Sequence, residues 1–469
     1  MVQHPTALPL PKKEGPRHTA TVSWALLLHF YQPPHQLPSI IRRVVEESYL
    51  PLLEVFRAHP QARATVNICG VLTETLWESG YREVIHQMRE LAERGQFEFT
   101  GSAKYHPILP LIPEAERVRQ IRRNFLANQH FFGEVYQPRG FFPPEMAYSA
   151  DIVKSVVESR HQWIILSGVA CPAAWPTTQV YEIPWEDESL AVLFRDDILS
   201  NKISFQNIHA HDFLGHLRHL NGDHSRSYVI TAMDAETFGH HIPKWEETFL
   251  GAVFDLIRPE AQAATTAALA KVTEDASRAL DPAAVPLVHR HLGPESAADG
   301  YAAPTPSIRS VTISEIVDGF LRGPQVQPKA SSWSTSAEDL AHDNVFPLWD
   351  DPGNPLHKLL WKHMRLATEM VLGAEEMADN DASRNFAGIG RALLDQALHS
   401  CQFWWASRRP MWDVNMVHRG LLQQEEAILN ACRAIHVSGC PEQVKDEYFY
   451  RFAACRDLGN RITDLLINM

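Results

Sequence analysis

The sequence predicts a parallel α/β barrel followed by a C-terminal region of long helices. Between residues 22 and 320, short apolar segments alternate with segments of helical periodicity, which is typical of parallel strands joined by helices. Several apolar segments end in acidic or histidine side chains, and in a β/α barrel the C-terminal ends of the strands carry the chemistry. From residue 355 onward apolar residues recur at helical spacing, which indicates a helical bundle or cap.

The first predicted strand covers residues 22–28 and ends in His29, before a loop fixed by Pro33 and Pro34. His29 is either a hydrogen-bonded histidine of the core or a ligand-binding side chain at a strand end. The elements expected after it are a helix at 40–58, a strand at 64–68 and a helix at 72–94.

The next predicted strand, residues 95–100, contains Glu98 between Phe97 and Phe99. Glu98 lies either on a solvated face or in the mouth of the barrel. The mouth is favoured because helices cover the outer face of a parallel barrel. The strand leads into a proline-rich loop that contains His106.

Glu145 follows Pro143 and Pro144 in a segment, residues 139–148, where another strand ends at a turn. An acid after two prolines is also a common first-turn residue of a helix, where it complements the helix dipole. The neighbouring expected elements are helices at 113–132, 150–159 and 203–220 and strands at 162–167, 180–183 and 190–194.

Residues 228–233 are almost wholly apolar and predict a strand buried on both faces. Asp234 and Glu236 follow at its C-terminal end, and His240 and His241 come next. Asp234 either caps the following element or belongs to a cluster of functional groups at the barrel mouth.

The rest of the chain divides into a linker and a helical domain. Residues 282–306 are rich in alanine, proline and glycine, which indicates a long loop or linker. A short helix is expected at 312–320, and long amphipathic helices are expected at 356–377, 383–406, 416–436 and 441–467. We therefore divide the chain into a disordered tail at 1–20, a catalytic barrel domain at 21–325 and a helical domain at 326–469.

The composition narrows the possible partners. The formal charge of −13 over 469 residues argues against nucleic acid or an anionic membrane, because both attract concentrated positive charge. Six scattered cysteines predict reduced thiols and neither a zinc site nor a disulfide scaffold. No signal-peptide core and no run of eighteen apolar residues occurs. We expect a cytoplasmic protein with a neutral ligand and no metal or cofactor, and leave its oligomeric state open.

Glu145 and Asp234 follow two different predicted strands and supply the pair of carboxyl groups that glycosidic-bond cleavage requires. One such group protonates the leaving oxygen, while the other attacks or stabilises the oxocarbenium-like carbon. The segments around them resemble the ordered motifs of glycoside hydrolase family 57. The resemblance is carried by HFYQP at 29–33, GQFEFT at 95–100 with YHPILPL at 105–111, FPPE at 142–145 and MDAETFGHH at 233–241.

The resemblance implies an incomplete seven-stranded β/α barrel, retaining chemistry on α-glucans and a helical region that contributes to the cleft. The family includes α-amylases, 4-α-glucanotransferases, branching enzymes and amylopullulanases. By motif position, Glu145 is the nucleophile and Asp234 the general acid/base. The same comparison places four further side chains around the sugar, namely His29, Glu98, His106 and His240.

A fifth motif is expected at residues 398–405, where Trp404 and Trp405 either pack in a core or form a platform for sugar rings. The sequence departs from the family pattern at two places. Tyr31 stands where the family usually has a histidine, and Ser400-Cys401 stands where an aspartate is often found.

The residues leave two other functions open. A metal-dependent polysaccharide deacetylase also uses an incomplete barrel, and its zinc ligands could be His29, Asp234, His240 and His241. No His-x-x-x-His pair supports that function, and it gives Glu145 no role. The second alternative is a non-catalytic glycan-binding protein. Loss of activity on metal chelation would support the deacetylase, and any turnover of a glycan would exclude a non-catalytic binding protein.

Overall fold

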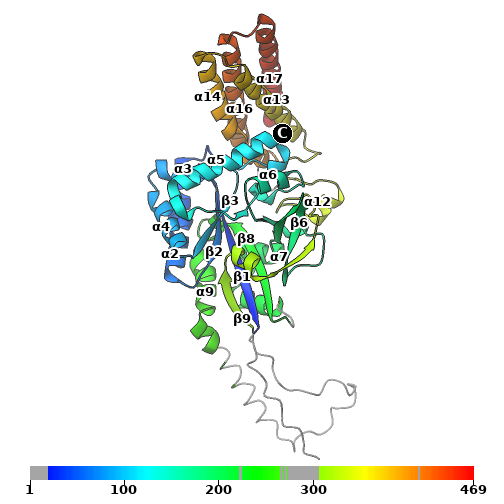
Figure 1. Ribbon diagram of the computed structural model, residues 1–469. Coiled ribbons are helices and arrows are strands. Elements are labelled where there is room, and N and C mark those ends of the chain that lie inside the picture. Colours follow the sequence, from blue (N-terminus) through cyan, green and yellow to red (C-terminus); the bar gives the residue numbers. More distant parts are fainter. Residues whose placement is uncertain are drawn as a thin grey trace, which may run out of the picture.

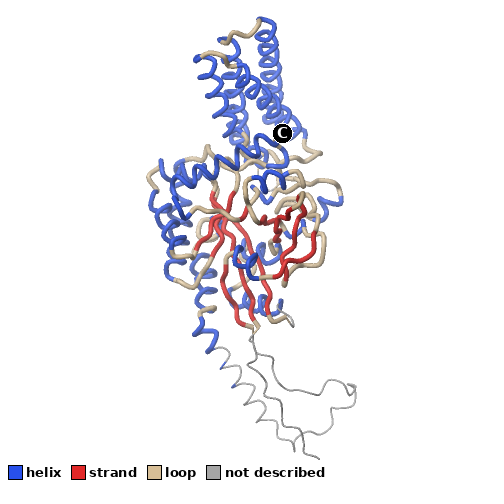
Figure 2. The backbone as a smooth tube through the Cα atoms, viewed as in Figure 1, coloured by secondary structure: helices blue, strands red, loops and turns tan. Residues whose placement is uncertain are grey.

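The protein consists of a curled β-sheet covered by helices and a bundle of long C-terminal helices (Figures 1 and 2). The computed structural model describes residues 20–220, 224–264, 267, 271, 306–409 and 412–468. Apart from Ala20 and Pro306, the predicted tail at 1–20 and linker at 282–306 lie outside the described residues. No helix in the described ranges is both long and apolar enough to cross a membrane.

Seven strands form an open parallel barrel. In spatial order they are β8 (Arg226–Asp234), β1 (Thr21–Phe30), β2 (Ala64–Ile68), β3 (Phe97–Gly101), β4 (Gly140–Phe141), β5 (Trp163–Leu166) and β7 (Glu188–Phe194). Each of these strands pairs in parallel with the next. The strand order of the described sheet runs open from one edge to the other, so the predicted fold class, an incomplete barrel followed by helices, is confirmed.

Three further strands extend the sheet to ten. They are β6 (Gln179–Trp185), β9 (Ser307–Val311) and β10 (Leu321–Gln325). β6 and β7 form an antiparallel hairpin, whereas β10 pairs in parallel with β6 and β9 pairs in parallel with the first half of β1. The sequence predicted β6 as a strand but not its antiparallel direction.

Helices cover the outer face of the barrel. Their bounds are α1 (Pro38–Val44), the π-helix η1 (Val45–Tyr49), α2 (Leu50–Ala58), α3 (Gly70–Glu78), α4 (Arg82–Glu93), α5 (Glu114–Phe132), α6 (Ile152–Glu158), α7 (Asp197–Ser204), α8 (Ala210–Leu220), the π-helix η7 (Glu246–Gly251) and α9 (Ala252–Leu256). A further helix, α11 (Ile313–Gly319), packs its apolar side chains into the core inside the barrel. The helix predicted at 72–94 is two helices, because Gly80 adopts a φ of 88° that breaks the helical path. The helix predicted at 203–220 is likewise interrupted between α7 and α8.

Short helical turns and the C-terminal bundle complete the chain. The turns are η2 (Leu109–Leu111), η3 (Gly133–Val135), η4 (Pro144–Met146), η5 (Gly168–Ala170), η6 (Ala235–Thr237) and α12 (Ala337–Ala341). The bundle contains α13 (Pro355–Met377), α14 (Asp381–Ala397), α15 (Cys401–Trp405), α16 (Val414–Val437) and α17 (Glu442–Asn468). The helix predicted at 383–406 therefore ends at Ala397, and a new helix begins at Cys401.

The side chains of β1 show how the barrel core is filled. Trp24, Leu26 and Leu28 belong to the core between the sheet and its outer helices, whereas Ala25 and Leu27 belong to the core inside the barrel. Alternate residues of a strand point to opposite faces, so an apolar strand of this kind must be covered on both sides. The strand predicted at 228–233 is likewise buried on both faces, as expected, since every residue from Tyr228 to Met233 is buried in β8.

A buried ion-pair network fixes the bundle to the barrel. Arg391 of α14 binds Glu116 of α5, with 2.5 Å between Nη2 and Oε2. Asp395 of α14 accepts two hydrogen bonds from Arg119 of α5, at 2.7 and 2.8 Å. Breaking one partner of such a buried network leaves an uncompensated charge, so the two regions are held in a defined orientation.

Candidate active site

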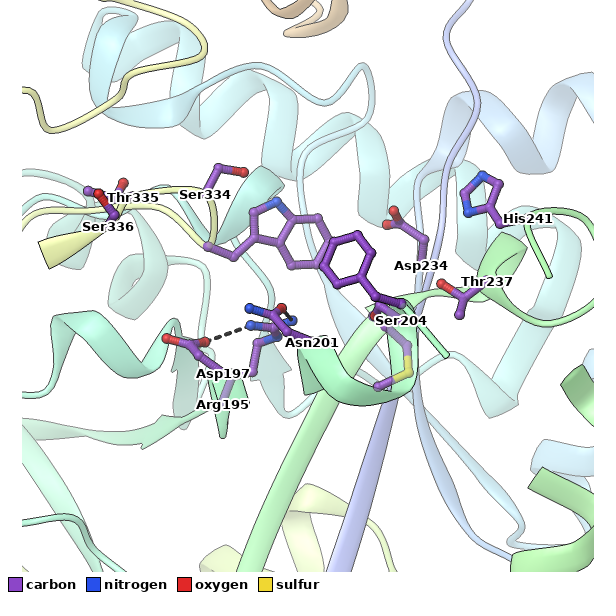
Figure 3. Close-up of a pocket in the computed structure, with 13 residues that line it drawn as sticks. Arg195, Asp197, Asn201, Ser204, Asp234, Thr237, His241, Ser334, Thr335 and Ser336 are labelled. Carbon is purple, nitrogen blue, oxygen red and sulfur yellow. Dashed lines mark hydrogen bonds and ion pairs between the residues drawn. The ribbon is translucent and has the colours of Figure 1, made fainter. Parts of the chain in front are cut away.

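A cleft opens at the C-terminal ends of the barrel strands and consists of two adjoining cavities of about 510 and 520 Å³. Five residues line both cavities, namely Phe205, Asp234, His241, Trp333 and Ser334. Figure 3 shows the first cavity, with Asp234 and His241 on one side and Ser334–Ser336 on the opposite side. The second cavity contains Glu145. The two carboxyl groups predicted to carry the chemistry therefore lie in one cleft.

Glu145 occupies a strained turn directly after the two-residue strand β4. Its φ is 58° and the φ of Met146 is 48°, which places two successive non-glycine residues in the left-handed region. Each such conformation costs on the order of 1–3 kcal/mol and persists only where surrounding contacts enforce it. Here the Glu145 carbonyl accepts a 3.1 Å hydrogen bond from the Trp333 amide, and the Pro143 carbonyl accepts one of 2.8 Å from Met146. The turn directs the Glu145 carboxyl into the cleft.

The Glu145 carboxyl lies partly buried among polar groups. Burial raises its pKa to about 8, and the nearby charge of Asp234 adds to the increase. Hydrogen bonds from the Trp333 indole and the Ser400 hydroxyl oppose that increase. The indole Nε1 lies 2.8 Å from Glu145 Oε2, a geometry that favours the ionised carboxylate.

Asp234 is the last residue of β8 and pairs in register with His29 of β1. Burial raises the pKa of Asp234, while the Arg195 guanidinium lowers it. Glu236, in the turn after β8, accepts hydrogen bonds from Tyr49 and, at 2.9 Å, from Gln32 Nε2. Burial and the Asp234 charge raise the pKa of Glu236 as well. The charge of Asp234 therefore disfavours the ionisation of both Glu145 and Glu236, and the three carboxyl groups titrate as an interacting set.

Arg195 is held in place below the first cavity. Its Nε donates to the Ala232 carbonyl at 2.8 Å, and its Nη1 lies 2.7 Å from Asp197 Oδ1 (Figure 3). The fixed positive charge favours the ionised form of Asp234.

Four predicted substrate-binding residues lie in or directly beneath this cleft. His29, Trp404 and Trp405 line the cavity that contains Glu145, and Trp405 is only 8% exposed. His106 lies beneath the cavity, with its Nδ1 3.6 Å from Glu145 Oε1. The structure therefore brings the fifth motif, from the helical bundle, to the carboxyl groups of the barrel.

Glu98 is not brought to the cleft, and its predicted direction toward the barrel mouth is corrected. It is the second residue of β3, three residues before the C-terminal end of that strand. Its Oε1 accepts hydrogen bonds from Thr65 Oγ1 at 2.6 Å and from the Ser314 amide at 3.0 Å. The carboxyl group therefore anchors the start of α11 to the sheet.

His240 is also turned away from the cleft, and His241 lines both cavities in its place. The Nδ1 of His240 lies 2.5 Å from Glu47 Oε2. The preceding Gly239 has a φ of 104°, and a Cβ atom there would lie 1.8 Å from the Glu47 carbonyl oxygen. Only glycine permits this close approach, which determines which of the two adjacent histidines faces the cleft.

Two aromatic residues of the site were missed by sequence reasoning. Trp333 lies in the serine-rich segment 331–336, shortly after the domain boundary placed at 325/326, for which no structural element was predicted. Phe205 was placed inside a continuous helix, but α7 ends just before it, and its side chain is 70% exposed beside both cavities. Large aromatic rings at the surface of a cleft are suited to contact sugar rings.

The two departures from the family pattern contact each other. Cys401 Sγ lies 3.5 Å from the Tyr31 hydroxyl oxygen, and the Tyr31 ring stacks on the His106 ring with centroids 3.9 Å apart. Within the described ranges, no group of three or more His, Cys, Asp or Glu side chains is arranged to hold a metal ion.

Comparison with known proteins identifies relatives of this chain. The model of glycosyl hydrolase family 57 matches residues 23–280, more than half of the chain. An α-amylase from Dictyoglomus thermophilum is 31% identical over 150 residues, which cover 32% of this chain and 21% of the relative. An α-amylase from Pyrococcus horikoshii is 29% identical over 242 residues, which cover 49% of this chain and 37% of the relative. A 4-α-glucanotransferase from Thermococcus litoralis is 24% identical over 216 residues, which cover 45% of this chain and 32% of the relative.

Solved structures share the fold over most of the chain. A family 57 branching enzyme from Pyrococcus horikoshii aligns with a TM-score of 0.65 at 15% identity, covering 92% of this chain and 94% of that one. The Thermococcus litoralis 4-α-glucanotransferase aligns with a TM-score of 0.61 at 18% identity, covering 88% and 59%. The matches to the curated relatives, by contrast, span only 21 to 37% of their length. The family match, together with the open barrel and its paired carboxyl groups, establishes that this chain belongs to glycosyl hydrolase family 57.

Proposed function

We propose that the protein is a retaining glycoside hydrolase or transglycosylase of α-glucans, with Glu145 as nucleophile and Asp234 as general acid/base. The observation that carries this proposal is the position of both partly buried carboxyl groups in one aromatic-lined cleft at the C-terminal ends of the strands. The names of the relatives, α-amylase and 4-α-glucanotransferase, support the choice of α-glucan as substrate. The six cysteines, none of which forms a disulfide, support a cytoplasmic location.

The proposed reaction has two steps. In the first, a Glu145 carboxylate oxygen forms a bond to the anomeric carbon while the glycosidic bond breaks and Asp234 gives its proton to the leaving oxygen. In the second, Asp234 removes a proton from an acceptor hydroxyl, whose oxygen displaces Glu145 from the anomeric carbon. Water as acceptor gives hydrolysis, and a sugar hydroxyl gives transfer or branching.

The electrostatics of the cleft support a proton shared between the two groups. The charge of Asp234 raises the pKa of Glu145 only while Asp234 is ionised. When Asp234 holds the proton, that contribution vanishes, and the Trp333 and Ser400 donors favour an ionised Glu145. The reactive arrangement is therefore one proton on Asp234 and none on Glu145. The opposite arrangement, with the proton on Glu145, is unreactive and is in equilibrium with the reactive one.

We propose that the glucan lies across both cavities. The cavity of Glu145 offers apolar surfaces for sugar rings, supplied by Tyr31, Trp349, Trp404 and Trp405. The adjoining cavity offers polar partners for hydroxyl groups, supplied by Asp197, Asn201, Ser204 and Ser336. Phe205 and Trp333 line both cavities and would flank the bond that is cleaved.

Product analysis tests the proposed function. The protein is incubated with maltoheptaose and with amylose, and the products are separated by chain length and assayed for branch points. Shorter chains alone indicate hydrolysis, a mixture of shorter and longer chains indicates transfer, and new branch points indicate branching. Glu145→Gln should lose this activity. Glu98→Gln is its matched control, because it makes the same change in a carboxyl group outside the cleft. The proposal fails if neither substrate is converted by a folded, homogeneous protein.

The helical region would be part of the enzyme under this proposal. We keep the division into a catalytic domain at 21–325 and a helical domain at 326–469 as a proposal. It is supported by β10, which ends at Gln325 and is the last strand of the sheet along the described chain. Trp404 and Trp405 then come from the helical domain, so the cleft is incomplete without it.

A further inference from the structure

A further large cavity lies outside the barrel, at the end of the sheet opposite to the cleft. It has a volume of about 850 Å³ and is bounded by α5, by the segment that leads from η3 into β4, and by the end of α6. Pro138 and Arg139 of its lining come directly before β4, whereas Glu145 follows the end of β4. The cavity is therefore separate from the cleft, and the proposed reaction assigns it no role.

The floor of this outer cavity is apolar and fixed in position. Ile121 and Tyr136 line it and are only 3% and 1% exposed. The Tyr136 hydroxyl donates to the Thr100 carbonyl at 3.2 Å and accepts a hydrogen bond of the same length from Asn124 Nδ2. Phe125 lies at the rim, 37% exposed, with its ring centroid 5.9 Å from that of Tyr136. The Phe125 ring is thus an exposed aromatic surface beside a rigid floor.

Two arginines that line the outer cavity have free guanidinium groups. Neither Arg122 nor Arg160 makes a side-chain hydrogen bond or ion pair with any residue of the described ranges. Arg139 also lines the cavity, but its guanidinium is occupied, because its two Nη atoms bind the carboxylate oxygens of Asp318 at 2.7 and 2.8 Å. Arg122 and Arg160 are therefore the cationic donors that a ligand can use.

Arg160 occupies a backbone position that suits glycine better. The helix α6 ends at Glu158, and Arg160 follows two residues later with a φ of 64°. The left-handed residue after a helix is usually glycine, because a Cβ atom makes this conformation costly. The chain has an arginine there, and its side chain lines the cavity. Since the turn gains nothing from the guanidinium, the side chain itself is the reason for an arginine at this position.

The remaining polar groups favour a neutral ligand over an anion. The Glu158 carboxyl lines the cavity, and α6 ends at the same residue, so the partial negative charge of the helix C-terminus lies beside it. These charges largely offset the free guanidinium groups of Arg122 and Arg160. Gln129 and Gln137 add side-chain amides, which both donate and accept hydrogen bonds. The matching ligand carries uncharged groups that also donate and accept, as hydroxyl groups do.

A sugar chain presents the two kinds of surface that this cavity requires. The C–H face of a glucose ring can pack on Phe125, while its hydroxyl groups bind the planar side chains of Arg122, Arg160 and Glu158. The volume exceeds that of either cavity of the cleft and is typical of a ligand site. Among the described residues that line the cavity, Glu158 is the one that carries a carboxyl group. Glycosidic-bond cleavage needs two, so the site would bind a glucan without cleaving it.

We propose that the outer cavity is a second carbohydrate-binding site, which holds a segment of an α-glucan outside the cleft. The choice of an α-glucan rests on the proposed function, whereas the position and chemistry of the site do not. A polymer longer than the cleft can be bound at both places, and the second attachment raises the concentration of the chain near the cleft. Phe125 is the platform for a sugar ring, and Arg122 and Arg160 are donors to its hydroxyl groups.

Calorimetric titration of the full chain with maltoheptaose tests the site. The titration uses Glu145→Gln, so that the ligand is not consumed, and we expect two binding sites per chain. Adding Phe125→Ala should weaken the outer site about tenfold, because the apolar face of the sugar loses its platform. Leu126→Ala is the matched control, since Leu126 is the next residue of α5, is 52% exposed and lies outside the lining of the cavity. That control should keep both sites.

Arg160→Gly separates binding from stability. Glycine adopts a φ of 64° without strain, so the unfolding temperature of the variant should not fall below that of the wild type. Its affinity at the outer site should nevertheless fall about two- to tenfold, which corresponds to the loss of one hydrogen-bond donor. Unchanged affinity in folded Phe125→Ala and folded Arg160→Gly refutes the site.

Kinetics measure what the site contributes to the reaction. With Glu145 intact, Phe125→Ala should raise KM for amylose by about the factor lost in binding. Its kcat/KM for maltotriose should equal that of the wild type, because so short a chain cannot occupy both places. An unchanged KM for amylose in a variant that has lost the outer site would refute its role in holding the substrate.

The outcomes distinguish this inference from the proposed function. If maltoheptaose binds at a site that depends on Phe125 but no α-glucan is converted, the second site stands and the proposed function fails. If α-glucans are converted and Phe125→Ala binds them like the wild type, the proposed function stands and the second site fails. Binding of an anion such as ATP in place of maltoheptaose, or an equal loss in Leu126→Ala, would overturn the assignment of the cavity to carbohydrate.

Discussion

Replacing Trp333 by phenylalanine should impair the ionisation of Glu145 while leaving the cleft aromatic. The indole Nε1 donates to Glu145 Oε2 at 2.8 Å, and phenylalanine removes that donor but keeps a ring. A hydrogen bond to a charged group contributes about 1.5–3 kcal/mol, which corresponds to about a 10- to 100-fold loss of kcat/KM at pH values below the pKa of Glu145. The pKa of about 8 already includes this donor, so the pKa of Glu145 should rise above 8 in the variant, and the loss should shrink only at pH values above that raised pKa.

The assay is kcat/KM for maltoheptaose from pH 5 to 9, compared with the unfolding temperature of each variant. Trp349→Phe is the matched control, because Trp349 lines the same cavity and its indole nitrogen has no hydrogen-bond partner. That control can change sugar binding but should not move the acidic limb. A Trp333→Phe variant with an unshifted limb and a wild-type unfolding temperature would refute the role of the indole donor.

Three other predictions follow from the same contacts. Glu145→Gln should abolish turnover and increase the free energy of unfolding at pH 7. The pKa of Glu145 is about 8 in the folded protein and 4.5 ordinarily, so the wild type loses stability as the pH rises through this range, whereas the glutamine does not. The gain is at most about 3 kcal/mol and is measured by denaturant unfolding at pH 5 and 7. An equal gain at both pH values would contradict it. Trp404→Ala should lower kcat/KM for long glucans at least tenfold with little loss of stability, since its side chain is half-buried in the cleft and not in the core; loss of folding instead would assign it a packing role. Activity should survive dialysis against a chelator, and a loss that zinc restores would favour the deacetylase alternative.

The fold could be predicted because its dominant features are local and periodic. The strands at 22–28 and 228–233 are largely apolar on both faces, and their alternation with helical patterns is typical of a parallel sheet. The hairpin of β6 and β7 was not predicted as antiparallel, since strand direction depends on pairing that periodicity does not contain. The break at Gly80 depends on a single left-handed residue inside an otherwise helical pattern.

The site was predicted only as far as the strand ends determine it. Asp234 lies where β8 stops and Glu145 lies in the turn after β4, so topology alone brings both to one edge. Glu98 was misplaced because alternation within a strand gives the face of a side chain but not its height in the barrel. His240 was predicted at the cleft where His241 lies, because the turn at Gly239 depends on a contact with Glu47, which is far away in the sequence. Trp333 reaches Glu145 across 188 residues, a contact that no local pattern contains.

The most direct test of the central claim is to trap the glycosyl-enzyme. In Asp234→Ala, an α-glucosyl fluoride has a leaving group that needs no protonation, so the first step proceeds while the second lacks its base. Peptide mass spectrometry after digestion should then find one glucosyl group on the carboxyl of Glu145, and added azide should release it. A glucosyl group on Glu236 or elsewhere, or a first product of inverted anomeric configuration with no adduct, would contradict the assignment of Glu145 as the nucleophile of a retaining enzyme.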